Sequence, residues 1–325
     1  MNEIPLKPND FGSDQEVRWC PGCGDYAILK AMKTVLADIG RSKDDVVFVA
    51  GIGCAARFPY YLSTYGFHTI HGRAAAVATG IKLANPDLDV WVVGGDGDFM
   101  SIGGNHTLHA LRRNVDLNLL LFNNAIYGLT KGQYSPTSPI GTRSPSSPSG
   151  SVEQPVNPVR FALGAGAKFV ARGADTLQTH LPEVLKRAHA NKGTSFVEIL
   201  QNCIVYADGA FGAINDRSES QEATIRLEHG QPMIFGKEND KGLVFNKDAC
   251  RFEVVRIADL ADKDALTIHD ETRLDRAMGL AQLEQPDFPV PLGVIYAVDA
   301  PEFIEAREFC GTKSTWGKEQ LKVLL

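Results

Sequence analysis

The chain has 325 residues, and its 44% hydrophobic content is enough for one large folded domain with an appendage or for two domains. Its 33 basic and 39 acidic residues give a net charge of −6, and no Lys- and Arg-rich cluster stands out, so we expect no nucleic-acid partner. The opening residues, MNEIPLKPND, lack the apolar segment of a signal peptide, and no apolar run reaches the roughly 18 to 20 residues that cross a bilayer. We therefore expect a cytoplasmic protein without a membrane contact.

Short apolar runs without alternation indicate buried parallel strands at residues 45–50, 89–93, 117–122 and 195–200. Helical spacing of apolar residues lies between these runs, at residues 26–39, 74–83, 105–112 and 176–190. Alternating strands and helices predict an α/β fold built on a doubly wound parallel sheet.

Residues 135–158 contain six prolines and many serines, which predicts a long loop of the kind that is usually functional or disordered. From about residue 217 the glycine-rich turns stop and the charge density rises, while residues 232–246 indicate a hairpin with its turn near Asn239 to Gly242. We expect a first domain at residues 1–216. Residues 217–325 form an appended C-terminal segment that packs on this domain or on a partner.

The stretch WVVGGDGDFMSIGGNH, residues 91–106, places two acids among glycines directly after an apolar strand. Asn123 and Asn124 end the next strand, and 25 residues separate Gly97 from Asn123. This interval fits one βαβ crossover, so Asp96 and Asn124 would meet at the carboxyl edge of the sheet, where open α/β sheets bind ligands. Asp and Asn oxygens, a backbone carbonyl just past Asn124 and two phosphate oxygens would complete an octahedral Mg²⁺ site.

The pattern GDG, then 25 residues, then NN resembles the thiamine diphosphate binding motif. A lone GDG is more often an ordinary turn, but the paired asparagines after a second buried strand favour the cofactor. Asp98 is expected to be a solvated neighbour or a charge at a helix N-terminus.

Four cysteines follow turns or predicted strand ends: Cys20, Cys23, Cys54 and Cys203. Cys54 and Cys203 each come a few residues after a predicted parallel strand, so both should emerge at the edge that carries Asp96. The tight CPGCG turn is typical of iron–sulfur ligation loops, although tetrahedral sulfur ligation also fits structural zinc. Beside a thiamine site, a redox cluster is favoured. Cys250 and Cys310 lie in the charged C-terminal segment and are expected to be free structural thiols.

Together with GDG and NN, the motifs WCPGCGDY, GIGC, HGR at residues 71–73 and LTKGQYSPT at residues 129–137 resemble the β subunit of 2-oxoacid:ferredoxin oxidoreductases. The resemblance covers about residues 15–215 and favours the 2-oxoglutarate branch. It implies thiamine diphosphate, Mg²⁺ and one [4Fe–4S] cluster, an α subunit as partner in an αβ or (αβ)2 assembly, and ferredoxin as electron acceptor. A carboxylate must activate the aminopyrimidine, and no glutamate of this chain stands at a place that matches the family, so that residue is expected on the α subunit.

The resemblance also assigns residues to the site. The cluster ligands would be Cys20, Cys23, Cys54 and Cys203, and Mg²⁺ would be held by Asp96, Asn124 and the carbonyl of Ile126. The cofactor would lie against Ile52, Gly53, Cys54, His71, Gly72, Arg73, Gly95, Asp96, Gly97, Asp98, Asn124, Ile126, Tyr127, Gly128, Leu129 and Thr130. Lys131 would contact the substrate carboxylate, and His71 would act beside the cofactor, although a surface lysine and a structural helix entry are the plain alternatives.

The implied reaction is the oxidative decarboxylation of 2-oxoglutarate with coenzyme A to succinyl-CoA and CO₂, with two electrons passed singly to ferredoxin. A sufficiently reducing ferredoxin could drive it backwards. The sequence leaves pyruvate or another 2-oxoacid open as the substrate. A non-redox thiamine decarboxylase subunit would keep Asp96 and Asn124 but would not need the four cysteines, whereas a zinc-bearing assembly subunit would leave GDG and NN unexplained.

Overall fold

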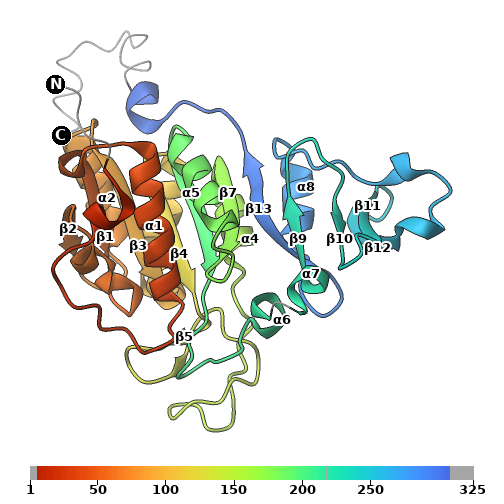
Figure 1. Ribbon diagram of the computed structural model, residues 1–325, viewed down its shortest axis with the longest axis horizontal. Helices are drawn as coiled ribbons and strands as arrows, with labels where there is room; N and C mark the ends of the chain where they lie inside the picture. The colour runs from red at the N-terminus through yellow and green to blue at the C-terminus, as the bar shows by residue number, and fades with distance from the viewer. Residues whose placement is uncertain (1–5, 217, 308–325) are drawn as a thin grey trace, which may run out of the picture.

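A sheet of eight strands forms the centre of the computed structural model, which describes residues 6–216 and 218–307 (Figure 1). Its strand order is β2-β1-β3-β4-β8-β7-β13-β9. In that order the bounds are Tyr65–His68, Val46–Ala50, Asp89–Gly95, Asn118–Asn123, Ser195–Leu200, Phe169–Ala174, Val290–Ala297 and Thr224–Leu227. The first six strands are mutually parallel. The predicted parallel α/β sheet is therefore confirmed.

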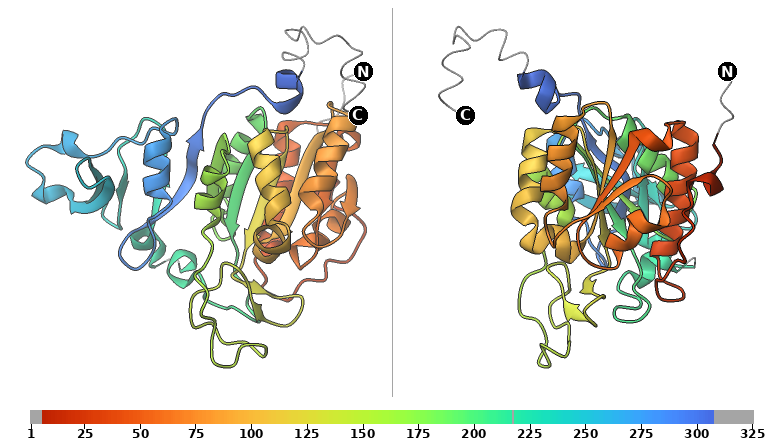
Figure 2. Two further views of the ribbon diagram at one scale, coloured as in Figure 1. Left: turned by 180° about the vertical axis from the view of Figure 1, so that it is seen from behind. Right: turned by 90° about the vertical axis from the view of Figure 1, so that its left-hand side faces the viewer.

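Helices cover both faces of this sheet, as two opposite views show (Figures 1 and 2). The two main apolar clusters of the core lie on these two faces. One face carries α1 (Asp25–Ile39) and α5 (His180–Ala190), and the other carries α2 (Ala74–Ala84), α3 (Gly104–Arg113) and α4 (Pro158–Gly164). The strands β1, β3, β4, β7 and β8 are buried along their lengths, with one half-buried residue, Gly95. This double burial explains the continuous apolar runs in the sequence.

The four predicted strands and helices all form, with ends shifted by a few residues. The largest shift is in α5, which begins at His180 rather than near residue 176. The Gln178 side chain donates a hydrogen bond to the Asp175 carbonyl and holds the preceding residues in a turn. Residues 135–157 contain no helix and no strand longer than an isolated bridge, as the prolines predict.

The C-terminal segment contributes to the main sheet and also builds a small sheet. β13 pairs antiparallel with β7, and β9 pairs parallel with β13. The small sheet joins β10 (Ile234–Phe235), β11 (Lys241–Asn246) and β12 (Arg251–Arg256), and α8 (Leu274–Leu280) packs beside it. The pairing of Ile234 with Gly242 and of Phe235 with Lys241 confirms the predicted hairpin, but its turn lies at residues 236–240 rather than near Asn239 to Gly242. A domain boundary at residue 216 stays a prediction.

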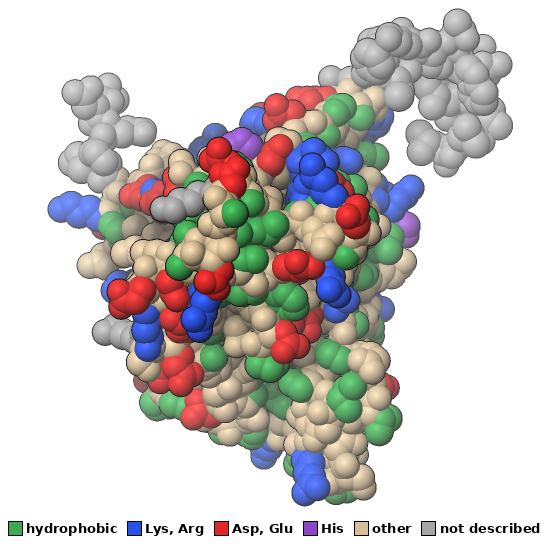
Figure 3. All heavy atoms as spheres, turned by 90° about the vertical axis from the view of Figure 1, so that its right-hand side faces the viewer, with side chains coloured by type: hydrophobic (Ala, Val, Ile, Leu, Met, Phe, Trp, Pro, Cys, Tyr) green, Lys and Arg blue, Asp and Glu red, His purple; other side chains and the backbone are tan. Residues whose placement is uncertain are grey.

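The remaining elements are short. They are η1 (Pro8–Phe11), η2 (Lys43–Asp45), η3 (Ala55–Tyr61), η4 (Asp98–Ile102), β5 (Ile126–Tyr127), β6 (Gln133–Tyr134), α6 (Gly212–Asn215), α7 (Ser220–Ala223), η5 (Ile257–Asp259) and η6 (Lys263–Ala265). Acidic and basic side chains are interspersed on the face that carries the small sheet (Figure 3). Within residues 6–216 and 218–307, no helix has the length and apolar composition to span a bilayer.

Candidate functional site

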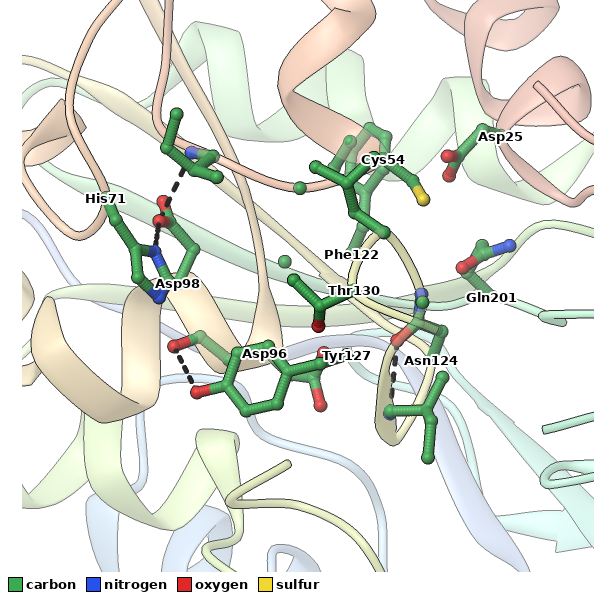
Figure 4. A pocket seen from close by; sticks show the side chains of 18 residues that line it. Asp25, Cys54, His71, Asp96, Asp98, Phe122, Asn124, Tyr127, Thr130 and Gln201 are labelled. Carbon is green, nitrogen blue, oxygen red and sulfur yellow. Dashed lines mark hydrogen bonds and ion pairs between the residues drawn. The ribbon is translucent and has the colours of Figure 1, made fainter. Parts of the chain in front are cut away.

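The carboxyl ends of the parallel strands open into a cavity (Figure 4). Parallel neighbours place the residues after β1, β3, β4 and β8 at one edge of the sheet. The cavity lies at this edge and is lined by residues 52–55, residues 95–98, residues 126–130, and by Asp25, His71, Phe122, Asn124 and Gln201. The spacing of GDG and NN predicted that Asp96 and Asn124 meet at one edge of the sheet, and both residues line this cavity.

Asp96 follows β3 directly and is 1% exposed. Its Oδ2 atom accepts hydrogen bonds from the hydroxyls of Ser135, at 2.5 Å, and Thr137, at 2.6 Å. Burial raises the pKa of Asp96, and these two hydroxyls and nearby backbone amides oppose that rise. Among the described residues, no ion pair includes Asp96. A buried carboxylate of this kind, facing a cavity with Asn124, fits a divalent cation.

The two ends of the GDG and NN motif touch through a tyrosine. The Tyr127 hydroxyl donates a hydrogen bond to the Gly97 carbonyl at 3.1 Å. A Cβ atom at position 97 would lie 2.1 Å from the Tyr127 ring, so the close approach of the two loops requires glycine here. Asn124 points its Oδ1 atom back to the amide of Ile126 at 3.2 Å, which closes the turn after β4.

Asp98 is 2% exposed, so the expectation that it is a solvated neighbour is wrong. It begins the short helix η4, but its carboxylate turns inward against residues 51–53 and 71–73. Its Oδ1 atom accepts hydrogen bonds from the amides of Ile52, at 3.2 Å, and Gly72, at 2.8 Å, and from His71 Nδ1. A Cβ atom on Gly51 would lie 1.9 Å from Asp98 Oδ2. Asp98 thus joins two loops of the cavity and orients the His71 ring.

The predicted cysteine ligands lie on neighbouring segments beside the cavity. The sulfur atoms of Cys54 and Cys203 are 3.6 and 3.5 Å from the point where a Cβ atom of Gly128 would stand. The amide of Gly24 donates to the Asn202 carbonyl at 3.2 Å, which joins the CPGCG turn to the segment of Cys203. Gln201 Nε2 donates to the Cys23 sulfur at 3.4 Å. The CPGCG turn, Cys54 and Cys203 thus lie on adjoining segments at the carboxyl edge of the sheet.

Burial perturbs these thiols. It raises the pKa of Cys54 to about 11, and neighbouring Asp25 and thiols add to the rise. Burial likewise raises the pKa of Cys23, with Asp25 as the next cause. Cys20 is exposed. Within the described residues, no three His, Cys, Asp or Glu side chains are arranged closely enough for one metal ion. Soft sulfur donors from three segments nevertheless suit an iron–sulfur cluster.

Comparison with known proteins identifies the family. Residues 47–199 match the family model described as thiamine pyrophosphate enzyme, C-terminal TPP binding domain. The chain is 49% identical over 305 residues to a Mycobacterium tuberculosis protein named 2-oxoglutarate oxidoreductase subunit KorB, and this match covers 93% of the chain and 81% of the relative. The chain belongs to the β subunits of the 2-oxoglutarate:ferredoxin oxidoreductases. The family inferred from the motifs is confirmed.

Two further relatives agree with this family. The β subunit of 2-oxoacid:ferredoxin oxidoreductase 1 from Aeropyrum pernix is 47% identical to this chain over 190 residues. That match covers 58% of this chain and 60% of the relative. A solved structure of 2-oxoglutarate:ferredoxin oxidoreductase from Magnetococcus marinus, with 2-oxoglutarate, coenzyme A and succinyl-CoA bound, superimposes with a TM-score of 0.76 at 33% identity. That superposition covers 100% of this chain and 97% of the solved one.

Within this family site, some predicted contact residues stand back from the cavity. Gly72, Arg73 and Lys131 are not among the lining residues, and Lys131 is exposed in a left-handed turn with φ of 76°. Their roles stay predictions. Cys250 is a free, exposed thiol, whereas Cys310 lies outside the described residues.

Sequence reasoning missed four lining residues: Asp25, Ala55, Phe122 and Gln201. Gln201 directly follows β8, so its place at the carboxyl edge of the sheet could have been predicted from the sequence. Asp25 is 1% exposed and neither of its carboxyl oxygens has a hydrogen-bond partner among the described residues. Burial raises the pKa of Asp25 to about 7. Its place in the WCPGCGD motif gave no sign of this burial.

Replacing Asp98 by Ala should lower the free energy of unfolding by about 1.5 to 3 kcal/mol or more, because the amides of Ile52 and Gly72 lose a charged acceptor in a buried place. Urea unfolding of the purified chain measures this loss. Asp87→Ala removes an exposed carboxylate and should change stability by no more than about 0.5 kcal/mol. Equal stability of the two variants would contradict the inward role of Asp98.

Proposed function

We propose that this chain supplies the thiamine diphosphate, Mg²⁺ and [4Fe–4S] site of an enzyme that converts 2-oxoglutarate and coenzyme A to succinyl-CoA and CO₂ while reducing ferredoxin. The observation that carries the proposal is the shared cavity, where a buried Asp96 and Asn124 stand at the strand ends next to cysteine-bearing loops. Relatives named for the 2-oxoglutarate reaction support the substrate and coenzyme A.

Within this proposal the metal ligands are Asp96, Asn124 and the carbonyl of Ile126, and the cluster ligands are Cys20, Cys23, Cys54 and Cys203. When bound, thiamine diphosphate supplies the thiazolium carbon that attacks the 2-oxo group. Asp98 accepts a hydrogen bond from His71 Nδ1 and so orients the ring with Nε2 as its free nitrogen. Gly97 and Tyr127 keep the two loops closed around this end of the cavity.

The turn after β4 connects the two parts of the proposed site. Residues 126–130 line the cavity, and Gly128 in this turn faces the sulfur atoms of both Cys54 and Cys203. Cys54 and Cys203 would hold the cluster against this turn, and the cluster would supply one-electron transfer to ferredoxin. The resemblance to the family implies that the α subunit supplies the carboxylate that activates the cofactor. An αβ or (αβ)2 assembly in the cytoplasm follows from this proposal.

Cys203→Ser removes one of the four proposed cluster ligands. The variant should contain less iron and sulfide, lose the broad visible absorption and no longer reduce ferredoxin. Iron, zinc and sulfide analysis with a visible spectrum checks this. The matched control is Cys250→Ser, which should keep both iron and activity since Cys250 is a free exposed thiol. Full iron in Cys203→Ser would place the fourth ligand elsewhere, and a colourless wild type with stoichiometric zinc would favour the zinc alternative.

Replacing Lys131 by Met should raise KM for 2-oxoglutarate by about 10- to 100-fold with little change in kcat, because a charge-assisted hydrogen bond of about 1.5 to 3 kcal/mol is lost from ground state and transition state alike. Steady-state kinetics of the complete enzyme measures both constants. Lys192→Met, at an exposed position outside the cavity, is the control and should leave KM unchanged. If the two variants had identical kinetics, Lys131 would be a surface lysine without a contact to the substrate.

A further inference from the structure

Residues 135–138, of sequence SPTS, lie against the buried end of the metal-binding motif. The Ser135 and Thr137 hydroxyls both reach Asp96 Oδ2. The Ser138 hydroxyl donates to the Ala125 carbonyl at 2.6 Å and accepts the amide of Ser135 at 2.7 Å. Three hydroxyls of one short segment therefore contact both halves of the motif, the carboxylate after β3 and the backbone after β4.

The direction of these hydrogen bonds leaves one oxygen of Asp96 for a ligand. Thr137 has a single hydroxyl proton, and it stands 2.6 Å from Asp96 Oδ2 and 3.0 Å from Asn123 Oδ1. The shorter, charge-assisted bond to the carboxylate is the stronger one. Because both side-chain donors reach Oδ2, the carboxylate is fixed in rotation and Oδ1 is the oxygen left to face an ion.

Beside Thr137, a buried network fixes Asn123, whose Oδ1 atom accepts a hydrogen bond from the amide of Ala125. Asn123 donates through Nδ2 to Glu198 Oε1 at 2.7 Å, and Glu198 Oε2 pairs with Arg172 at 2.7 Å. Arg172, Glu198 and Asn123 are at most 5% exposed. Such a network holds its members in one geometry, because any break leaves a buried polar group unpaired.

The turn after β4 also depends on this segment. Ala125 has a φ of 56°, in the left-handed region that costs a residue with a Cβ atom free energy. Its amide donates to Asn123 Oδ1 at 3.2 Å, and its carbonyl accepts the Ser138 hydroxyl. Ala125 stands between Asn124 and Ile126, so these contacts set where the amide oxygen of Asn124 and the carbonyl of Ile126 point.

We propose that Ser135, Thr137 and Ser138 form a hydroxyl clamp that orients Asp96 and the Ala125 turn for a divalent cation, with Thr137 as its principal positioning residue. This inference rests on the proposed Mg²⁺ site at Asp96. In this proposal the Ser- and Pro-rich loop orients the residues that bind the metal. If the loop were only a cover for the site, losing one hydroxyl would change stability without changing metal affinity.

The test is the affinity of the intact enzyme for Mn²⁺ in the presence of thiamine diphosphate, measured from the electron paramagnetic resonance signal of free Mn²⁺. Thr137→Val should raise the Kd for Mn²⁺ by about 10- to 100-fold, the usual effect of losing a hydrogen bond to a metal-ligating group. Thr137→Ser keeps the hydroxyl and should bind nearly as the wild type does. The control is Thr142→Val in the same loop, whose hydroxyl donates to the Pro139 carbonyl and which should leave the Kd unchanged.

Asp96→Ala separates this inference from the proposed function. If Asp96→Ala loses Mn²⁺ binding while Thr137→Val binds as the wild type does, the clamp is wrong and the metal site stands. If Asp96→Ala also binds normally, the metal site and the clamp are both wrong. Should Thr137→Val fail to fold by circular dichroism, Ser135→Ala decides by the same criteria, because Ser135 donates to the same oxygen.

Discussion

The site depends on one buried carboxylate. Asp96 is 1% exposed at the end of β3, and burial raises its pKa. The groups that stabilise its charged form are hydroxyls and amides, and no ion pair among the described residues supplies a full positive charge. A carboxylate in such surroundings becomes stable as an anion when a cation binds it. Gly97 lets the loop of Tyr127 approach the loop of Asp96, and β4 brings Asn124 to the same edge of the sheet. Two hydroxyls of the SPTS segment bind one oxygen of the Asp96 carboxylate.

The same edge of the sheet brings the cysteine-bearing loops together. Burial raises the pKa of Cys54 to about 11 and also raises that of Cys23. In our proposal, a metal that binds these thiols displaces their protons. Gly128 in the turn after β4 faces the sulfur atoms of Cys54 and Cys203, and both Gly128 and Cys54 line the cavity. In our proposal this shared turn keeps the cofactor and the cluster near each other, and Cys54 borders both.

The sequence predicted the parts of the molecule that follow regular patterns. Continuous apolar runs indicated β1, β3, β4 and β8, and the 25-residue interval placed Asp96 near Asn124. Sequence patterns did not predict the features that depend on tertiary contacts. β2 is exposed along its whole length and has no apolar run, and β13 joins the sheet antiparallel from the far end of the chain. The inward carboxylate of Asp98 and the burial of Asp25 depend on backbone amides and neighbouring loops, which no local spacing records.

The most direct test of the account is an anomalous-scattering map of crystals of the enzyme loaded with Mn²⁺ and thiamine diphosphate. We expect one manganese peak at the carboxyl edge of β3 and β4, at coordination distance from an oxygen of Asp96, from the amide oxygen of Asn124 and from the carbonyl of Ile126, as an octahedral divalent site requires. A manganese peak elsewhere in the chain, with Asp96 bonded only to Ser135 and Thr137, would contradict it.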